Sequence, residues 1–228
     1  MFRGFTPKSL KFLAELKRRN DREWFETHRR IYEREILEPG RAFVVEMGEH
    51  LQALVPTIHA DPRVNGSLFR IFRDSRFHRS DLFKDHVGFI FWQGRGRRMQ
   101  SASFYMHFTP DTLLFAAGIY RFKPAMRDAY REYLRDDRNR AALHAVFEGL
   151  RSTGYTLPEP GYKRYPRGFH AGMPNAYLAL YDAVYATKRM APEGVFFTDA
   201  LPAAAYDVYE GMFDLQQWVY AMVATAES

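Results

Sequence analysis

The spacing of apolar residues changes along this chain, and the change sets the fold class. Over residues 1–60, apolar side chains recur every three or four positions, as Leu10, Leu13 and Leu16 do, which is typical of helices. Over residues 86–120 they alternate with other side chains, as in strands. Helical spacing returns after residue 124. We therefore predict an α+β fold with a small sheet flanked by N-terminal and C-terminal helices.

The 228 residues are enough to bury one generous core, and we predict one domain over 1–228. This domain would be helical over 1–60, form a sheet over 67–122 and be helical over 124–228. Short connections favour antiparallel neighbours in the sheet, because parallel strands need long crossovers. The expected strands number about four, at residues 69–77, 86–92, 103–108 and 113–120.

Capping residues and breakers predict where the helices begin and end. Thr6-Pro7 is typical of a helix start, and Asp21 can cap a second helix. Pro39-Gly40 is expected to interrupt that second helix before the apolar pattern resumes. Proline and glycine are frequent in residues 155–174, which we interpret as an ordered loop. The remaining helices are expected to begin at Pro124, to end near Gly154, and to occupy residues 175–188 and 202–224.

Composition excludes several classes of site. The chain has no cysteine, so disulfides, thiolate catalysis, iron–sulfur clusters and Cys-ligated zinc are excluded. No segment approaches the ~20 apolar residues of a membrane span, and the N-terminus lacks the apolar core of a signal peptide. We expect a cytoplasmic protein without a membrane partner, without a cofactor and, by default, monomeric.

Positive charge is concentrated in one stretch. The net charge is +6, and residues 67–98 hold eight cations against three acids. Arg70, Arg73 and Arg76 lie in a segment with strand character, and Lys84 follows closely. Two interpretations stay open. The arginines can be ion-paired scaffold around Asp74, or they can converge on a phosphate or carboxylate, which guanidinium groups grip bidentately. Strict alternation would place Arg73 on the opposite face from Arg70 and Arg76.

Two histidines are candidates for chemistry on the sheet. If Phe89 and Phe91 face the core, then His86 lies on the other face of its strand. The same argument buries Phe104, Met106 and Phe108 on the next strand and leaves Ser103, Tyr105 and His107 outward. His86 and His107 are therefore expected to share one face. Two histidines alone do not make a metal site, and none is predicted.

Other basic segments suggest a different class of function. The hairpin loop at residues 93–98 holds Arg95, Arg97 and Arg98, and residues 163–170 interleave cations with aromatics, as surfaces that bind single-stranded nucleic acid do. A nucleic-acid-binding module is the alternative function. For the hairpin loop a solvated turn is the favoured interpretation, and for residues 163–170 aromatic packing under a loop explains the pattern equally well. A purely structural role with a protein partner is the third possibility.

With these residues located, the chain resembles an uncharacterised family catalogued as domain of unknown function 2461, found in bacteria, fungi and plants. The resemblance extends over most of the chain, and its most specific piece is the string from Arg70 to Phe77. The segments that carry it are residues 2–5, 20–25, 70–77, 83–86, 105–107, 117–120 and 165–169, together with Tyr32 and Pro39.

The resemblance implies no activity, substrate or cofactor, and two segments depart from the family pattern. Residues 80–84 read Ser-Asp-Leu-Phe-Lys where the family usually has Lys-x-Pro-Tyr-Lys, and residues 172–174 read Gly-Met-Pro where it tends to have Asp-His-Pro. If those residues belong to an active site, this member is altered there.

Our leading hypothesis is that the chain binds a phosphorylated or otherwise anionic small molecule. No catalytic motif accompanies the cations, so the sequence does not decide whether the protein is an enzyme. The predicted ligand-binding residues are Arg70, Arg73, Arg76, Lys84 and Arg167. The candidates for orienting those cations or exchanging protons are Asp74, His86 and His107.

Overall fold

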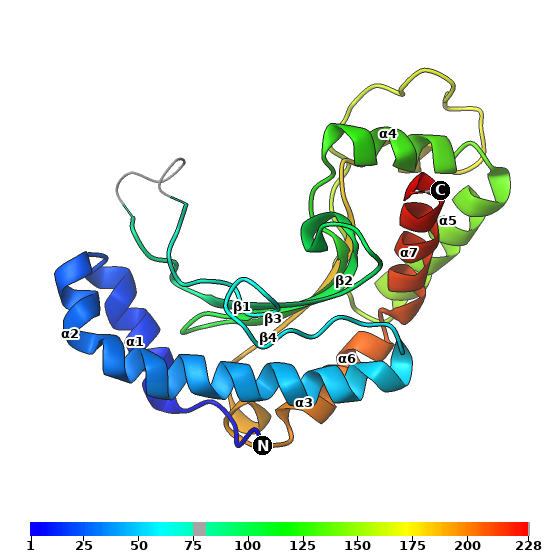
Figure 1. Cartoon of the computed structure of the whole chain (residues 1–228). Coiled ribbons are helices and arrows are strands. Elements are labelled where there is room, and N and C mark those ends of the chain that lie inside the picture. The colour runs from blue at the N-terminus through cyan, green and yellow to red at the C-terminus, as the bar shows by residue number, and fades with distance from the viewer. Residues whose placement is uncertain (75–80, 228) are drawn as a thin grey trace. The chain divides into compact units, whose positions relative to one another are not determined.

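The computed structural model describes residues 1–74 and 81–227, without the side chain of Glu227. Figure 1 shows a sheet with helices before and after it in the chain, which confirms the α+β class. The sheet is antiparallel, with strand order β1-β2-β3-β4. Its strands are β1 (Val87–Gln93), β2 (Ala102–Phe108), β3 (Leu113–Ile119) and β4 (Val184–Met190).

The N-terminal helices follow the predicted caps. α1 spans Pro7–Arg18, and α2 spans Arg22–Tyr32 with the Asp21 side chain accepting a hydrogen bond from the backbone N–H of Trp24 at 2.8 Å. The expected interruption at Pro39-Gly40 is wrong. A π-helical segment, η1 (Glu33–Leu37), joins α2 to α3 (Glu38–Leu54) without a break, and Pro39 lies in the first turn of α3, directly after the π-helical segment.

The predictions for the helices after residue 124 differ more from the structure. α4 (Pro124–Tyr133) and α5 (Asp137–Ser152) occur where expected. The predicted helix over 175–188 is wrong, since this segment holds a short 3-10 helix, η3 (Ala176–Leu180), and most of β4. The predicted helix over 202–224 is two helices, α6 (Leu201–Glu210) and α7 (Phe213–Glu227). Two shorter 3-10 segments are η2 (Arg98–Gln100) and η4 (Gly194–Phe197).

The predicted strand at 69–77 is also wrong within the described residues. Residues 67–74 and 81–86, which we call the ribbon, form isolated bridges instead of a regular strand. The backbone N–H of Arg73 donates to Leu82 and that of Lys84 donates to Ile71, at 2.9 and 2.8 Å. The ribbon pairs with itself in this way and places residues 84–86 at the start of β1.

The chain forms two compact units, and each is described by itself. Unit 1 comprises Met1–Phe91, Tyr105–Phe115 and Arg189–Asp207, and unit 2 comprises Trp92–Phe104, Ala116–Lys188 and Val208–Ser228. Each unit therefore holds part of every strand.

Aromatic rings fill the core of unit 1. Phe5, Phe43, Phe89 and Phe108 are fully buried, and the ring centroids of Phe5 and Phe108 lie 4.6 Å apart. Those of Phe43, on α3, and Phe89, on β1, lie 5.1 Å apart, so α3 packs on the face of the sheet opposite His86. Burying one such ring contributes roughly 1.5–3 kcal/mol, which fixes the strand register and with it the direction of the residues between.

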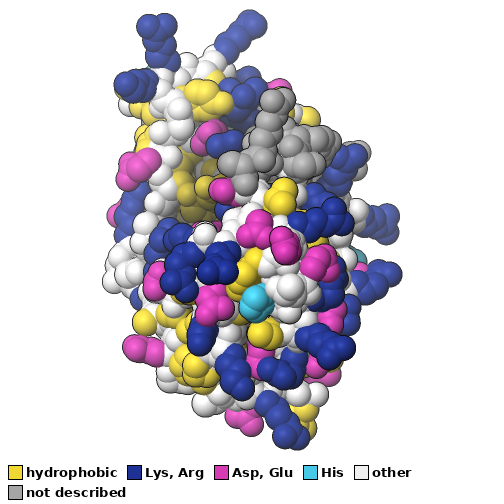
Figure 2. Space-filling model, turned by 90° about the vertical axis from the view of Figure 1, so that its left-hand side faces the viewer, with side chains coloured by type: hydrophobic (Ala, Val, Ile, Leu, Met, Phe, Trp, Pro, Cys, Tyr) yellow, Lys and Arg dark blue, Asp and Glu magenta, His cyan; other side chains and the backbone are white. Residues whose placement is uncertain are grey.

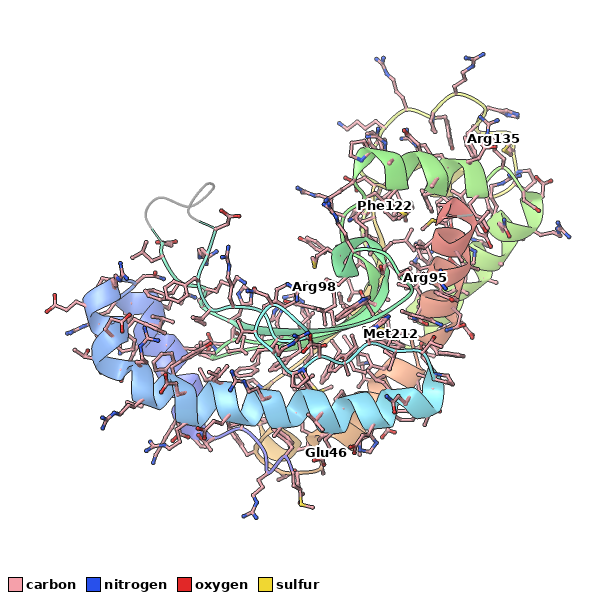
Figure 3. All side chains as sticks on the ribbon, in the orientation of Figure 1. Glu46, Arg95, Arg98, Phe122, Arg135 and Met212 are labelled. Carbon is pink, nitrogen blue, oxygen red and sulfur yellow. The ribbon has the colours of Figure 1, made fainter. Side chains whose placement is uncertain are left out.

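Unit 2 packs helices around Trp218 of α7. This indole contacts the rings of Tyr130 and Tyr133 on α4, at 6.0 and 5.3 Å between centroids, and donates a hydrogen bond to the backbone carbonyl of Asn139 at 3.1 Å. Figure 3 labels Phe122 near the start of α4 and Arg135 near its end. No helix among residues 1–74 and 81–227 has the length and apolar character that crossing a membrane requires.

Candidate functional site: a histidine face on the sheet

Two histidines of unit 1 come together on one face of the sheet. His86 directly precedes β1, and His107 lies on the neighbouring strand β2. Their ring centroids are 5.2 Å apart, with 45° between the ring planes. The expectation that they share a face is therefore confirmed. We call the two histidines with Asp85, Tyr105 and Lys84 the histidine face.

Each ring has one nitrogen occupied by a neighbour. Nδ1 of His86 lies 3.2 Å from Oδ1 of Asp85, and Nδ1 of His107 lies 3.2 Å from the Tyr105 hydroxyl. Tyr105 and His107 are two positions apart on β2, so they point to the same side. Among the described residues neither Nε2 atom has a hydrogen-bond partner. These two atoms are the ones that a ligand can reach.

The partner of each ring bears on its tautomer. A carboxylate only accepts, so the proton of neutral His86 lies on Nδ1 and its Nε2 keeps a lone pair. The Tyr105 hydroxyl can donate to Nδ1 of His107 or accept from it, and where it donates, the proton of that ring lies on Nε2. In that arrangement one ring offers an acceptor and the other a donor.

Burial keeps both rings neutral. It lowers the pKa of His86, against the opposing effect of Asp85, and it lowers the pKa of His107 to about 4, with a further contribution from the nearby His86. For Asp85, burial raises the pKa, but the hydrogen bond from His86, a backbone hydrogen bond and the nearby Arg73 together outweigh burial, so the net pKa lies below the usual value. At neutral pH the site therefore holds an ionised carboxylate beside two uncharged imidazoles.

Positive charges border this pair. Lys84 Nζ donates to the Arg70 carbonyl at 2.8 Å and lies over the Phe69 ring, 5.2 Å from its centroid. Arg73 donates from Nε to the Phe83 carbonyl at 2.9 Å, and its Nη2 lies 3.6 Å from Oδ1 of Asp85. Both cations lower the pKa of His86 further, which places their charge within electrostatic range of its ring.

Asn20 fixes the ribbon from the end of α1. Its side-chain amide donates to the Phe83 carbonyl at 3.0 Å, and its side-chain oxygen accepts from the Phe83 N–H at 2.8 Å. The Phe83 ring is buried and stacks on Phe25 with centroids 4.4 Å apart. These contacts hold the backbone one residue before Lys84, so Asn20 positions the histidine face without belonging to it.

The other predicted residues take different places. Arg70 is exposed, and its backbone carbonyl is the part that contacts Lys84. Asp74 is half-buried at the end of the described part of the ribbon, and Arg76 lies outside the described residues. Arg167 is exposed in unit 2. The structure therefore brings together Arg73, Lys84, His86 and His107 from the predicted set.

Sequence reasoning missed Asp85 and gave Tyr105 no role. Both had a usable signal. Asp85 directly precedes a candidate histidine, and Tyr105 is two positions before another one, on the same side of an alternating strand. The interpretation of the cation-rich stretch concentrated on Asp74 and overlooked the carboxylate next to His86.

Metal coordination finds little support at this site. Among residues 1–74 and 81–227, no three His, Asp or Glu side chains are grouped closely enough to hold a metal ion.

Positive charge is distributed broadly over the surface. Figure 2 shows Lys and Arg side chains spread over the face it draws, with Asp and Glu among them. Net positive charge does not by itself mark the site.

A hollow elsewhere in unit 1 is less specific. Its volume is about 760 Å³, and its lining includes Arg41, Glu46, His50 and Asp199, which mix both signs of charge. One Glu46 oxygen accepts the backbone N–H of Phe2 at 2.9 Å, so that carboxylate secures the N-terminal segment. Glu46, labelled in Figure 3, lies on α3.

Comparison with known proteins identifies the family. The model of a conserved hypothetical protein family, DUF2461, matches residues 8–218. The chain belongs to the DUF2461 family. The matched region includes the whole histidine face and its Asn20 anchor. No curated protein matches the sequence significantly.

Proposed function

We propose that this DUF2461 protein binds a phosphorylated or otherwise anionic small molecule at the histidine face. The observation that supports it best is the pair of half-buried imidazoles, 5.2 Å apart, whose Nε2 atoms have no partner among the described residues. A ligand that hydrogen-bonds to both Nε2 atoms would use these two groups at once.

A phosphate monoester matches the donors and acceptors of this face. Its protonated oxygen can donate to Nε2 of His86, and a charged oxygen can accept from Nε2–H of His107. Lys84 and Arg73 supply positive charge beside the imidazoles, and this charge attracts an anion to the site. A cation pair alone would attract any anion, whereas one acceptor next to one donor favours an anion that still carries a proton.

Proton exchange is an extension of this proposal. Asp85 holds Nδ1–H of His86 and directs the lone pair of Nε2 outward, which is the arrangement of a general base. The proposal concerns binding, and it stands whether or not turnover follows. A cytoplasmic location remains a prediction.

Thermal shift with matched variants tests the proposal. The probes are inorganic phosphate, glycerol 3-phosphate and AMP, at fixed pH and salt. A ligand at 100 times its Kd stabilises the native state by roughly 2.7 kcal/mol, which a melting curve resolves. We expect at least one probe to raise the melting temperature of the wild type and to lose that effect in His86→Ala and His107→Ala.

A histidine outside the site provides the control. His170 is exposed in unit 2, so His170→Ala should keep the full shift. Folded His86→Ala and His107→Ala variants that keep the same shift as the wild type would remove the histidine face from the proposal.

A further inference from the structure

An exposed tyrosine and the half-buried tyrosine beside it form a second surface feature, in unit 2, independent of the histidine face. Tyr120 directly follows β3 and is 71% exposed. Its ring contacts that of Tyr185 on β4, with centroids 5.3 Å apart and 45° between the planes. A phenol ring of this size that faces water leaves much apolar area without a partner in the described chain. Such area is often part of a binding surface.

The backbone beneath the pair is fixed. Gly118 has φ +114°, and a Cβ at this position would lie 2.2 Å from the backbone oxygen of Val184 and 2.8 Å from Cα of Tyr185. β3 and β4 therefore approach each other more closely here than a side chain permits, and glycine is required. The two tyrosines stand on a rigid section of sheet, so a flat ligand meets them at little entropic cost.

Cations from two loops border the pair. The Gln100 side chain donates to the Arg121 carbonyl and accepts from the Lys123 N–H, both at 2.8 Å. This clamp joins η2 to the segment after β3. Residues 94–100 and 120–127 together hold six cations and no carboxylate. We call Tyr120, Tyr185, Arg97, Arg121 and Lys123 the tyrosine platform, and its three cations are exposed.

The composition of the platform discriminates between ligand classes. Neutral sugars stack on tyrosine but gain nothing from three cations, and a simple polyanion gains nothing from an exposed ring. Single-stranded nucleic acid uses both, because its bases stack on aromatic faces while its phosphates pair with Lys and Arg. From this combination we propose that the tyrosine platform binds single-stranded nucleic acid, with Tyr120 stacking on a base and Arg121 and Lys123 contacting phosphates.

This surface differs from the one that sequence reasoning considered. The expected nucleic-acid segments were residues 93–98 and 163–170, and of these only Arg97 belongs to the platform. The tyrosines themselves were not considered for this role. A base-stacking site requires an exposed ring, and exposure is a property that the sequence does not display.

Fluorescence anisotropy with a labelled oligothymidylate tests the proposal on the full chain. Stacking on one aromatic side chain contributes roughly 1–3 kcal/mol, so Tyr120→Ala should weaken binding about tenfold or more. Tyr120→Phe keeps the ring and should bind as the wild type does. Tyr165→Ala, which removes a less exposed tyrosine of the same unit (37% exposed), should leave affinity unchanged.

The charge contribution has its own readout. The variant with Arg121→Ala and Lys123→Ala should bind more weakly, and the slope of log affinity against log salt should fall by about 0.7 for each phosphate contact that is lost. An abasic oligonucleotide of equal length carries the same charge without bases, and it should bind the wild type about tenfold more weakly.

Three outcomes would overturn the proposal. They are an oligonucleotide that does not bind, equal affinity for the abasic strand, and a Tyr120→Ala variant that binds as tightly as the wild type. None of them bears on the histidine face, because the two surfaces share no residue.

Discussion

Arg73 in unit 1 is half-buried and Arg140 in unit 2 is fully buried, and their hydrogen-bond partners differ. Arg140 is 1% exposed and donates to the carbonyls of Leu134, Arg135 and Pro174 and to the Asp137 carboxylate. The Arg73 side chain is 24% exposed and makes one hydrogen bond to the described residues, with Asp85 at ion-pair distance. A guanidinium whose three nitrogens are all hydrogen-bonded holds the fold together, whereas one with more donors to spare can also serve a ligand.

The largest expected effect is on the structural arginine. Arg140→Met keeps most of the side-chain volume but leaves several carbonyls of the α4–α5 turn and of Pro174 without their donor. Each unsatisfied buried group costs roughly 1–3 kcal/mol, so we expect a loss of about 3 kcal/mol in the free energy of unfolding. Urea denaturation measures it.

Ligand binding provides the control for this variant. Arg140→Met should not change the affinity of the histidine face for an anion at a temperature where the protein is folded. A loss of affinity without a loss of stability would contradict the assignment of Arg140 to structure.

The anchor of the ribbon is expected to have the next largest effect. Asn20→Ala removes both hydrogen bonds to the Phe83 backbone and should cost about 2 kcal/mol. Because the same backbone leads to Lys84, anion affinity should fall as well. Asn139→Ala, which removes a hydrogen bond to the Tyr133 carbonyl in unit 2, is the matched control and should spare binding. Equal anion affinity in both variants would show that the ribbon needs no anchor.

Much of the histidine face followed from alternation, and the rest depended on contacts distant in sequence. Alternation placed Phe104, Met106 and Phe108 inward and the two histidines on the same face. Successive side chains of a strand point to opposite faces, so once the buried face is known, the residues of the other face are known too. β4 was missed because helical spacing was assigned to 175–188, although Val184, Ala186 and Lys188 alternate with Tyr185 and Thr187.

The structural role of Arg140 could not be predicted from the local sequence pattern. This residue lies among exposed charges in the sequence of α5, and only the chain folding back at Pro174 supplies its acceptors. No local pattern distinguishes such an arginine from a solvated one. The strand expected at 69–77 was wrong for a similar reason, because this segment pairs with β1 only around Leu68 and then pairs with residues 82–84 of the ribbon itself.

A pH effect of intermediate size should distinguish the two regions further. Burial lowers the pKa of His107 from 6.5 to about 4, so between these pH values the unfolded chain binds a proton that the native state does not. Stability should therefore fall as the pH drops from 6.5 to 4, and His107 should contribute no pH dependence above 6.5.

Urea denaturation across this range tests the assignment. His107→Gln should flatten the dependence, whereas Arg140→Met should shift the whole curve downward without changing its slope. An unchanged slope in His107→Gln would show that His107 titrates normally.

The smallest effect concerns the carboxylate. Asp85→Asn removes ion pairs with Arg73 and Lys17, at 3.6 and 3.9 Å, that are partly exposed. Such pairs contribute under about 1 kcal/mol, so stability should change little. The pKa of His86 should drop further, because Asp85 is the group that opposes the effect of burial. An NMR titration of the imidazole measures it, and a rise in that pKa would contradict the assigned pairing.

The most direct test of the account follows the imidazole nitrogens of all eight histidines by NMR while inorganic phosphate, glycerol 3-phosphate or AMP is added. The account predicts that Nε2 of His86 and of His107 shift together, and saturably, with at least one of these anions. Shifts confined to other histidines, or no shift with any of the three, would contradict anion binding at the histidine face.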